Sequence, residues 1–273
     1  MNNILTIINL GRLLIALLVT CSIFLVIPTL KSDLREFNES IGESNFIGSL
    51  QQKALSSTVL VQTILDSQVN GSGSATLIKK SFKEDKFIYL FLCCNHVLSQ
   101  TAYDPWDDLA IIGLNRSEKG EVLNYDYFTL NQPDVVCHMI NASSESDFGV
   151  IMIASKIDLL PNVTVANIAN KQDIESISVN SQVVCAGHPI GETSIAALGT
   201  ILQVGVSCET PRISLSDAVV VDSIIIPGMS GGGVYNDKGL LVGFISYGLS
   251  DCMLGFIPLD QVYEKIKTTM NLF

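Results

Sequence analysis

The chain has 273 residues, 48% of them hydrophobic, so it can bury a sizeable core and is not a disordered protein. Its 16 basic residues are outnumbered by 27 acidic ones, giving a net charge of -11. This balance argues against a nucleic-acid partner or an anionic membrane surface, because both require clustered Lys and Arg.

The N-terminal part of the chain contains an apolar run without any charge, from Leu13 to Leu30. A run of this length can cross a bilayer as a helix. A cleaved signal peptide would have a shorter apolar region followed by a small-x-small site. We therefore predict an uncleaved single-pass anchor over residues 1–30. Basic residues stand on both sides of the run, so their count leaves its orientation open.

The texture of the sequence changes after the predicted anchor. Residues 31–54 are polar and show no sustained period, which is typical of a linker. Short runs rich in Val, Ile, Leu, Thr and Phe then follow one another, separated by Gly, Asn, Asp and Pro. Such runs predict strands, and the absence of helical patterns between them indicates an all-β domain of sandwich or barrel type over residues 55–273.

The end of the chain has a different pattern. After Pro258, the apolar residues Val262, Ile266 and Met270 recur every four positions. This spacing lies on one face of a helix, so we predict a C-terminal helix that packs back on the barrel.

The cysteines outside the apolar run have irregular spacing that matches no metal-site pattern. Most of them lie beside Val, Leu or Ala, so we interpret them as buried thiols. Their pairing in an oxidising compartment cannot be chosen from the sequence. We expect no metal and no cofactor.

The strongest local signal is the glycine-rich segment from Pro227 to Gly233, which contains Ser230. Glycines allow a sharp turn that brings backbone N–H groups close to a bound carbonyl, as an oxyanion site requires. Ser230 is therefore our candidate nucleophile. A flexible glycine turn with an incidental serine is the competing interpretation.

The same segment also fits G-x-S-x-G, the nucleophile turn of α/β-hydrolases. In that fold the catalytic histidine follows the serine. Here the three histidines, His96, His138 and His188, all precede Ser230. This order, together with the strand-rich texture, argues against an esterase of that class.

Among the histidines, His96 is the best candidate for a general base. It follows the apolar run 87–94, where a buried strand would reach the surface of a barrel. His138 lies in a strand-like stretch and His188 in a Gly-His-Pro turn, and both are more typical of structural histidines.

Asp147 is the candidate acid, because it immediately precedes an apolar run that would form a core strand. Asp108 also precedes such a run, but it follows His96 too closely to leave room for intervening strands. Histidine before aspartate before serine is the chain order of the chymotrypsin triad.

Six segments in order and spacing resemble the HtrA/Deg branch of the trypsin-like serine peptidases, over roughly residues 55–270. They are GSGSATLI, CCNHVLS, SDFGVIMIAS, AGHPIGETSIAALGTILQVGVS, VVVDSIIIPGMSGGGVYNDKGLLVGFIS and LGFIPLDQVYEKI. The resemblance implies an all-β fold of two six-stranded antiparallel β-barrels with the active site between them. It also places His96, Asp147 and Ser230 on the positions of the triad.

The resemblance implies further site residues. The backbone N–H groups of Gly228 and Ser230 would form the oxyanion hole, although Met229 stands between them where relatives usually have Asn or Asp. Ile224 would form the base of the specificity pocket. The wall of the pocket, which would pair with substrate as an added strand, is expected to contain Ser246, Tyr247 and Gly248. An Ile without a carboxylate predicts small or medium apolar side chains at the cleavage site.

The expected function is that of a serine endopeptidase acting on protein or peptide substrates, in quality control or regulated proteolysis at a membrane. By resemblance, the catalytic domain would lie on the periplasmic or extracytoplasmic side, and a trimer is implied by the family alone. The PDZ domain common in that family is expected to be missing, because the chain stops soon after the predicted C-terminal helix. The alternative from a different class is a catalytically silent module that binds peptides, because a distorted loop around Met229 would abolish activity with the triad intact.

Overall fold

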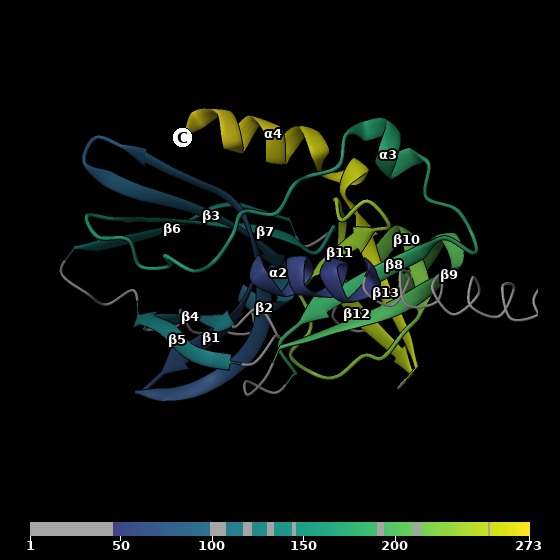
Figure 1. Ribbon diagram of the computed structural model, residues 1–273, viewed down its shortest axis with the longest axis horizontal. Helices are drawn as coiled ribbons and strands as arrows, with labels where there is room; N and C mark the ends of the chain where they lie inside the picture. Colours follow the sequence, from purple (N-terminus) through teal and green to yellow (C-terminus); the bar gives the residue numbers. More distant parts are fainter. Residues whose placement is uncertain are drawn as a thin grey trace, which may run out of the picture. The chain divides into compact units, whose positions relative to one another are not determined.

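The computed structural model describes residues 46–98, 108–116, 122–129, 134–143, 146–189, 194–209, 214–250 and 252–273. Leu50–Phe273 forms one compact unit that contains two β-sheets, with β1 to β7 in the first and β8 to β13 in the second (Figure 1). The predicted all-β class is confirmed.

The first sheet has seven antiparallel strands in the order β5-β4-β1-β2-β3-β7-β6. They are β1 (Thr58–Leu65), β2 (Gln68–Lys83), β3 (Lys86–Cys94), β4 (Asp108–Arg116), β5 (Val122–Thr129), β6 (Val135–Ser143) and β7 (Phe148–Ser155). We expected a closed six-stranded barrel here, and this expectation is corrected: over the described residues, the edge strands β5 and β6 do not pair. Closure depends on the tilt and stagger of all the strands in the sheet, which the pattern within each run does not encode.

The second sheet is a closed barrel of six strands in the order β10-β13-β12-β11-β8-β9. They are β8 (Gln182–Gly187), β9 (Ile195–Glu209), β10 (Ser214–Asp222), β11 (Gly233–Asn236), β12 (Leu241–Ser250) and β13 (Met253–Pro258). For this half of the domain the predicted barrel is confirmed.

Short helices join and cover the sheets. They are α2 (Asn95–Leu98), α3 (Lys171–Glu175), the 3-10 helix η2 (Leu259–Gln261) and α4 (Tyr263–Leu272). The predicted C-terminal helix is thus confirmed, and α4 lies against β6 of the first sheet (Figure 1). Its buried Ile266 anchors the apolar face that the four-residue spacing predicted.

Residues 46–56 are also helical, although residues 31–54 were interpreted as a linker. Leu50 and Ala54 lie one turn apart on this helix and are both buried. The segment also contains Phe46, Ile47 and Leu55, so its apolar residues follow a helical spacing that the linker interpretation overlooked. Burial of Leu50 and Ala54 stabilises this short helix.

In the described part of the chain, no helix is long and apolar enough to cross a membrane. The anchor predicted over residues 1–30 lies outside the described residues.

Strand β3 links the core to the site. Its last seven residues are all buried, because the strand is covered by other elements on both faces. Phe148 at the start of β7 contacts Phe244 of the barrel, with ring centroids 6.5 Å apart. The Cys94 thiol at the end of β3 donates a 3.0 Å hydrogen bond to the carbonyl of Ile245 in β12. The end of β3 therefore lies directly against the second barrel.

Candidate active site

The pairing of β3 with β7 brings two predicted site residues together. The strands are antiparallel with Cys94 opposite Phe148, so the residues after Cys94 and before Phe148 share one edge of the sheet. At this edge the backbone N–H of Asn95 donates to the carbonyl of Asp147 over 3.0 Å. This bond ends β3 and begins α2, which carries His96.

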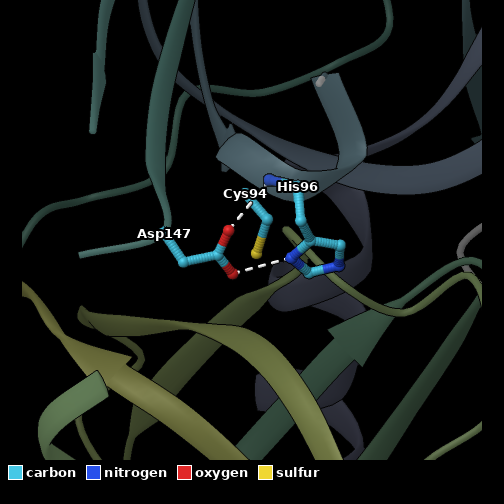
Figure 2. A group of neighbouring side chains, drawn as sticks. All are labelled: Cys94, His96 and Asp147. Atoms are coloured by element: carbon cyan, nitrogen blue, oxygen red, sulfur yellow. Dashed lines mark hydrogen bonds and ion pairs between the residues drawn. The ribbon is translucent and has the colours of Figure 1, made fainter. Parts of the chain in front are cut away.

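The Asp147 carboxylate holds His96 at two points (Figure 2). Its Oδ1 accepts a 2.9 Å hydrogen bond from the backbone N–H of His96, and its Oδ2 lies 2.7 Å from His96 Nδ1. Because an ionised carboxylate can only accept, Nδ1 carries the hydrogen, and Nε2 is left as the acceptor. The arrangement therefore fixes both the tautomer and the orientation of the imidazole.

Asp147 is only 2% exposed and has a backbone φ of +43°. Asp tolerates the left-handed region better than most residues do. The unusual backbone angle lets the carbonyl bond Asn95 while the carboxylate of the same residue turns to His96. The His96 side chain is 22% exposed, so one edge of the ring remains open to a reacting group.

Ser246 of β12 adds a contact that the sequence did not reveal. Its hydroxyl donates a 2.5 Å hydrogen bond to Asp147 Oδ2. From the family resemblance, Ser246 was expected only in the wall of the specificity pocket. The barrel therefore supplies a donor to the carboxylate that the first sheet holds.

Ser230 lies in the loop between β10 and β11, at the same junction of the two sheets. Its hydroxyl donates to the carbonyl of Ser246 over 3.2 Å. Within the described residues, no hydrogen bond joins Ser230 Oγ to His96. A hydroxyl can reach a neighbouring acceptor by rotating about χ1, and such catalytic bonds often form only when substrate is bound.

The two predicted oxyanion donors have no hydrogen-bond acceptor in the part of the chain that the structure describes. The amides of Met229 and Gly231 donate to the carbonyls of Ile226 and Ile245, at 3.1 and 2.8 Å. Among the described residues, the amides of Gly228 and Ser230 donate to none. Gly228 has a φ of +100°, which a residue with a side chain rarely adopts. The turn therefore leaves two amides available to an incoming acceptor.

Ile224, the predicted base of the specificity pocket, and its neighbour Ile225 lie in different surroundings. The Ile224 side chain is 51% exposed, whereas a Cγ atom of Ile225 lies 3.3 Å from the position that a Cβ on Gly248 would take. Ile225 therefore packs against Gly248, and the role of Ile224 stays a prediction. The chain leaves β10 at Asp222, so strand alternation no longer gives the direction of these side chains.

The other two wall residues differ in orientation. The ring of Tyr247 packs on Gly255 of β13, where any Cβ would overlap it. Gly248 is exposed. The backbone at Gly248 is thus the part of β12 that an added strand could reach.

Cys94, His96 and Asp147 offer ligand atoms within 4.8 Å of one another, a spacing compatible with a metal ion. These ligand atoms already have partners. Cys94 Sγ donates to the Ile245 carbonyl, and His96 Nδ1 lies 2.7 Å from Asp147 Oδ2. Burial, and next the Asp147 carboxylate, also raise the pKa of the Cys94 thiol well above its usual value. We therefore interpret the group as a histidine–carboxylate pair beside a neutral thiol.

The competing candidates lie elsewhere. His138 is exposed on β6, and Asp108 begins β4. His188 is buried after β8, where its backbone N–H donates to the Ser74 hydroxyl over 2.8 Å. Ser74 had no assigned role in the sequence analysis, because nothing local distinguishes it from a turn serine.

Known proteins share this architecture. The crystal structure of Deg5 superimposes with a TM-score of 0.58 at 20% identity, covering 81% of this chain and 92% of that one. The HtrA-type protease AlgW, in its structure with a tripeptide, gives a TM-score of 0.55 at 18% identity, covering 80% of this chain and 62% of that one. At this level of identity the likeness shows the fold, which is chymotrypsin-like.

The sequence comparisons agree. Proteins described as serine protease HtrA-like from Staphylococcus aureus, for example strain USA300, are 22% identical over 185 residues. The match covers 63% of this chain and 23% of the relative, so the chain spans about a quarter of the length of these curated relatives. The model of the trypsin-like peptidase domain matches residues 73–244, which is more than half of the chain. The resemblance to HtrA/Deg-type peptidases is thus confirmed, and the chain belongs to the family of trypsin-like peptidase domains.

Proposed function

We propose that the chain is a serine endopeptidase that hydrolyses peptide bonds in protein substrates. Ser230 would be the nucleophile, His96 the general base and Asp147 the residue that orients the base. The observation that carries the proposal is the 2.7 Å contact between His96 Nδ1 and Asp147 Oδ2, together with two amides that have no acceptor among the described residues. An oriented imidazole and free N–H donors are the two parts that acyl transfer needs.

The chemistry would proceed through an acyl-enzyme. The Ser230 hydroxyl turns from the Ser246 carbonyl to His96 Nε2, which takes its proton as Oγ attacks the substrate carbonyl carbon. The amides of Gly228 and Ser230 stabilise the oxygen that becomes negative. The imidazolium then protonates the leaving amine, and a water molecule activated by the same ring releases the acid.

Asp147 stabilises the imidazolium that forms in this step. Its carboxylate is buried and accepts from His96 and Ser246, so its negative charge acts at close range with little screening by water. A proton shift onto the carboxylate is not needed for this role.

The substrate is proposed to be an extended peptide that pairs with the exposed backbone at Gly248. Ile225 packs against Gly248 and would narrow the space that receives the side chain before the cleaved bond. A narrow apolar pocket favours Val or Ala over Lys, Arg and large rings.

A silent peptide-binding module is the second candidate. One observation favours it: the Ser230 hydroxyl bonds the Ser246 carbonyl and not the imidazole. Such a protein would bind apolar peptides without forming an acyl-enzyme.

We propose three further properties: membrane attachment through residues 13–30, an extracytoplasmic catalytic domain and a trimeric assembly. The first rests on the uncharged run in the sequence, and the others on family resemblance. Extraction of the full chain by detergent but not by high salt or alkaline carbonate would support the anchor.

A fluorophosphonate probe tests the proposed function directly, because it labels only an activated serine. The full chain would be compared with Ser230→Ala and His96→Ala, and with His138→Ala as the matched histidine control on the exposed face of β6. We expect labelling of wild type and His138→Ala, and none of the two site variants. A folded wild type that binds apolar peptides but takes no label would favour the silent module.

A further inference from the structure

Ser74 of β2 makes two hydrogen bonds to the nucleophile loop. Its backbone N–H donates to the carbonyl of Ser230, and its hydroxyl donates to the carbonyl of Gly228, each over 2.7 Å. These two residues are the ones whose amides are the proposed oxyanion donors. From these contacts we infer that Ser74 is a positioning residue that holds the oxyanion loop in its reactive conformation, an inference that rests on the proposed function.

The polarity of the Ser74 hydroxyl is fixed by its surroundings. The residue is fully buried, and the backbone N–H of His188 donates to Ser74 Oγ over 2.8 Å. Because a hydroxyl has one hydrogen, accepting from His188 leaves that hydrogen for the carbonyl of Gly228. Ser74 Oγ is therefore the donor in its bond to Gly228, and the bond is lost if the Gly228 carbonyl turns away from Ser74.

The loop needs such an external restraint. Gly228 has no Cβ, so sterics alone allow its peptide plane to rotate between several orientations. The Gly228 carbonyl shares its peptide plane with the Met229 N–H, and this peptide lies between the two proposed donors, Gly228 N–H and Ser230 N–H. The bond to Ser74 fixes the carbonyl of Gly228, and with it the course of the chain into Met229 and Ser230.

Close packing supports the same conclusion. A Cβ on Gly73 would lie 3.2 Å from the Ser230 carbonyl oxygen, and a Cβ on Gly231 would overlap the Ser74 carbonyl. That carbonyl also accepts a 3.1 Å bond from the Cys93 thiol. The backbones of β2 and the nucleophile loop are thus in direct contact. The N–H, the carbonyl and the hydroxyl of Ser74 each make at least one hydrogen bond.

The contact also crosses between the two sheets. Ser74 belongs to the first sheet, whereas the nucleophile loop leads into β11 of the closed barrel. The orientation of the oxyanion donors therefore depends on correct packing of the first sheet against the second.

Ser74→Ala removes only the hydroxyl and keeps the backbone bond to Ser230. Loss of a complete oxyanion donor lowers kcat by about 100- to 1,000-fold. Because the variant loosens the donors without removing them, we expect kcat to fall by about 10- to 100-fold, with KM changed less than about threefold.

Ser57→Ala is the matched control. Ser57 is also a buried serine, and its hydroxyl bonds the Tyr235 hydroxyl over 2.6 Å, away from the nucleophile loop. Both variants remove one buried hydroxyl and should lower the unfolding temperature to a similar degree. Ser57→Ala is expected to keep kcat.

The experiment uses the full-length protein with a fluorogenic peptide that has valine before the cleaved bond. Three quantities are measured: kcat and KM, the rate of fluorophosphonate labelling, and the affinities of the matching peptide aldehyde and peptide alcohol. The aldehyde forms an oxyanion on the serine and the alcohol does not. We expect Ser74→Ala to weaken aldehyde binding by the same factor as kcat, with alcohol binding unchanged.

Ser74→Cys keeps the shape of the side chain but donates a weaker hydrogen bond. It should fold as wild type does, with kcat lowered by about 3- to 10-fold. This variant therefore tests the role of Ser74 even if Ser74→Ala does not fold. Wild-type kcat in either folded variant overturns the inference about Ser74. An equal loss of alcohol and aldehyde binding does so too. A wild type that neither cleaves nor takes label overturns the proposed function itself.

Discussion

Ser246 and Asp147 are joined by a 2.5 Å hydrogen bond, in which the hydroxyl donates to the carboxylate oxygen that also contacts His96 Nδ1. Ser246 belongs to the barrel and Asp147 to the turn that precedes β7 of the first sheet. The same residue offers its carbonyl to the Ser230 hydroxyl. Ser246 thus contacts both the acid and the nucleophile of the proposed triad.

Ser246→Ala should lower kcat by about tenfold, because a hydrogen bond to a charged group contributes about 1.5 kcal/mol or more. KM should stay nearly constant, since the backbone that would pair with substrate is unchanged. Steady-state kinetics on a valine peptide provide the measurement, and Asp147→Asn, with an expected loss of about 10⁴-fold, sets the upper limit. A change confined to KM would assign Ser246 to substrate binding alone.

Ile225→Ala should enlarge the specificity pocket, because it removes the side chain that packs against Gly248. We expect the ratio of kcat/KM for Leu or Phe peptides over Val peptides to rise by about tenfold. Ile224→Ala is the control, since Ile224 is exposed and should leave this ratio unchanged. If Ile224→Ala shifts the preference and Ile225→Ala does not, the assignment from the structure is wrong.

Alkylation of cysteines should separate buried from exposed thiols. Burial raises the pKa of Cys185 to about 12 and raises those of Cys93 and Cys94 as well, whereas Cys252 is exposed. Because the thiolate is the reactive form, iodoacetamide at about pH 8 should modify Cys252 in the folded protein and spare the other three. Peptide mass mapping before and after unfolding in guanidinium measures which cysteines are modified. Rapid modification of Cys94 in the native protein would show that the His96 turn opens to solvent.

Asp158 should make stability depend on pH. Burial raises its pKa, but hydrogen bonds from Lys80 at 2.8 Å and Tyr89 at 2.6 Å outweigh burial, so the net shift is downward. A depressed pKa in the folded state adds stability above the unfolded-state pKa of about 3.9, and this is lost as pH falls through the folded-state pKa.

Asp158→Asn should therefore cost about 1 kcal/mol of unfolding free energy at pH 7, a modest figure because the pair is partly exposed. The difference from wild type should shrink as pH falls below about 4. Urea unfolding at pH 7 and at pH 3 measures it. An equal difference at both pH values would show that the carboxylate charge is not what stabilises this site.

The positions of His96 and Asp147 were predictable because each adjoins a buried strand. The apolar runs that became β3 and β7 are visible in the sequence, and their antiparallel pairing puts the following and preceding residues at one edge. Ser230 was predictable from its flanking glycines. In these cases the informative pattern lies within a few residues of the candidate residue.

Ser74 could not be found in this way. Its partner Gly228 is 154 residues further along the chain, and the bond exists only because β2 packs against the nucleophile loop. The packing of Ile225 against Gly248 was not predictable for a related reason, because outside a regular strand no periodicity gives the direction of a side chain.

The sequence by itself determined the all-β class, the strand runs, the C-terminal helix and the order of His96, Asp147 and Ser230, since side-chain polarity along the chain records which residues face a core. Only the tertiary structure decided that the first sheet has seven strands, which isoleucine reaches Gly248, and that Ser74 and Ser246 touch the site. These features depend on pairing and packing between distant segments, which is fixed by complementary surfaces and hydrogen-bond geometry and leaves no local period in the chain.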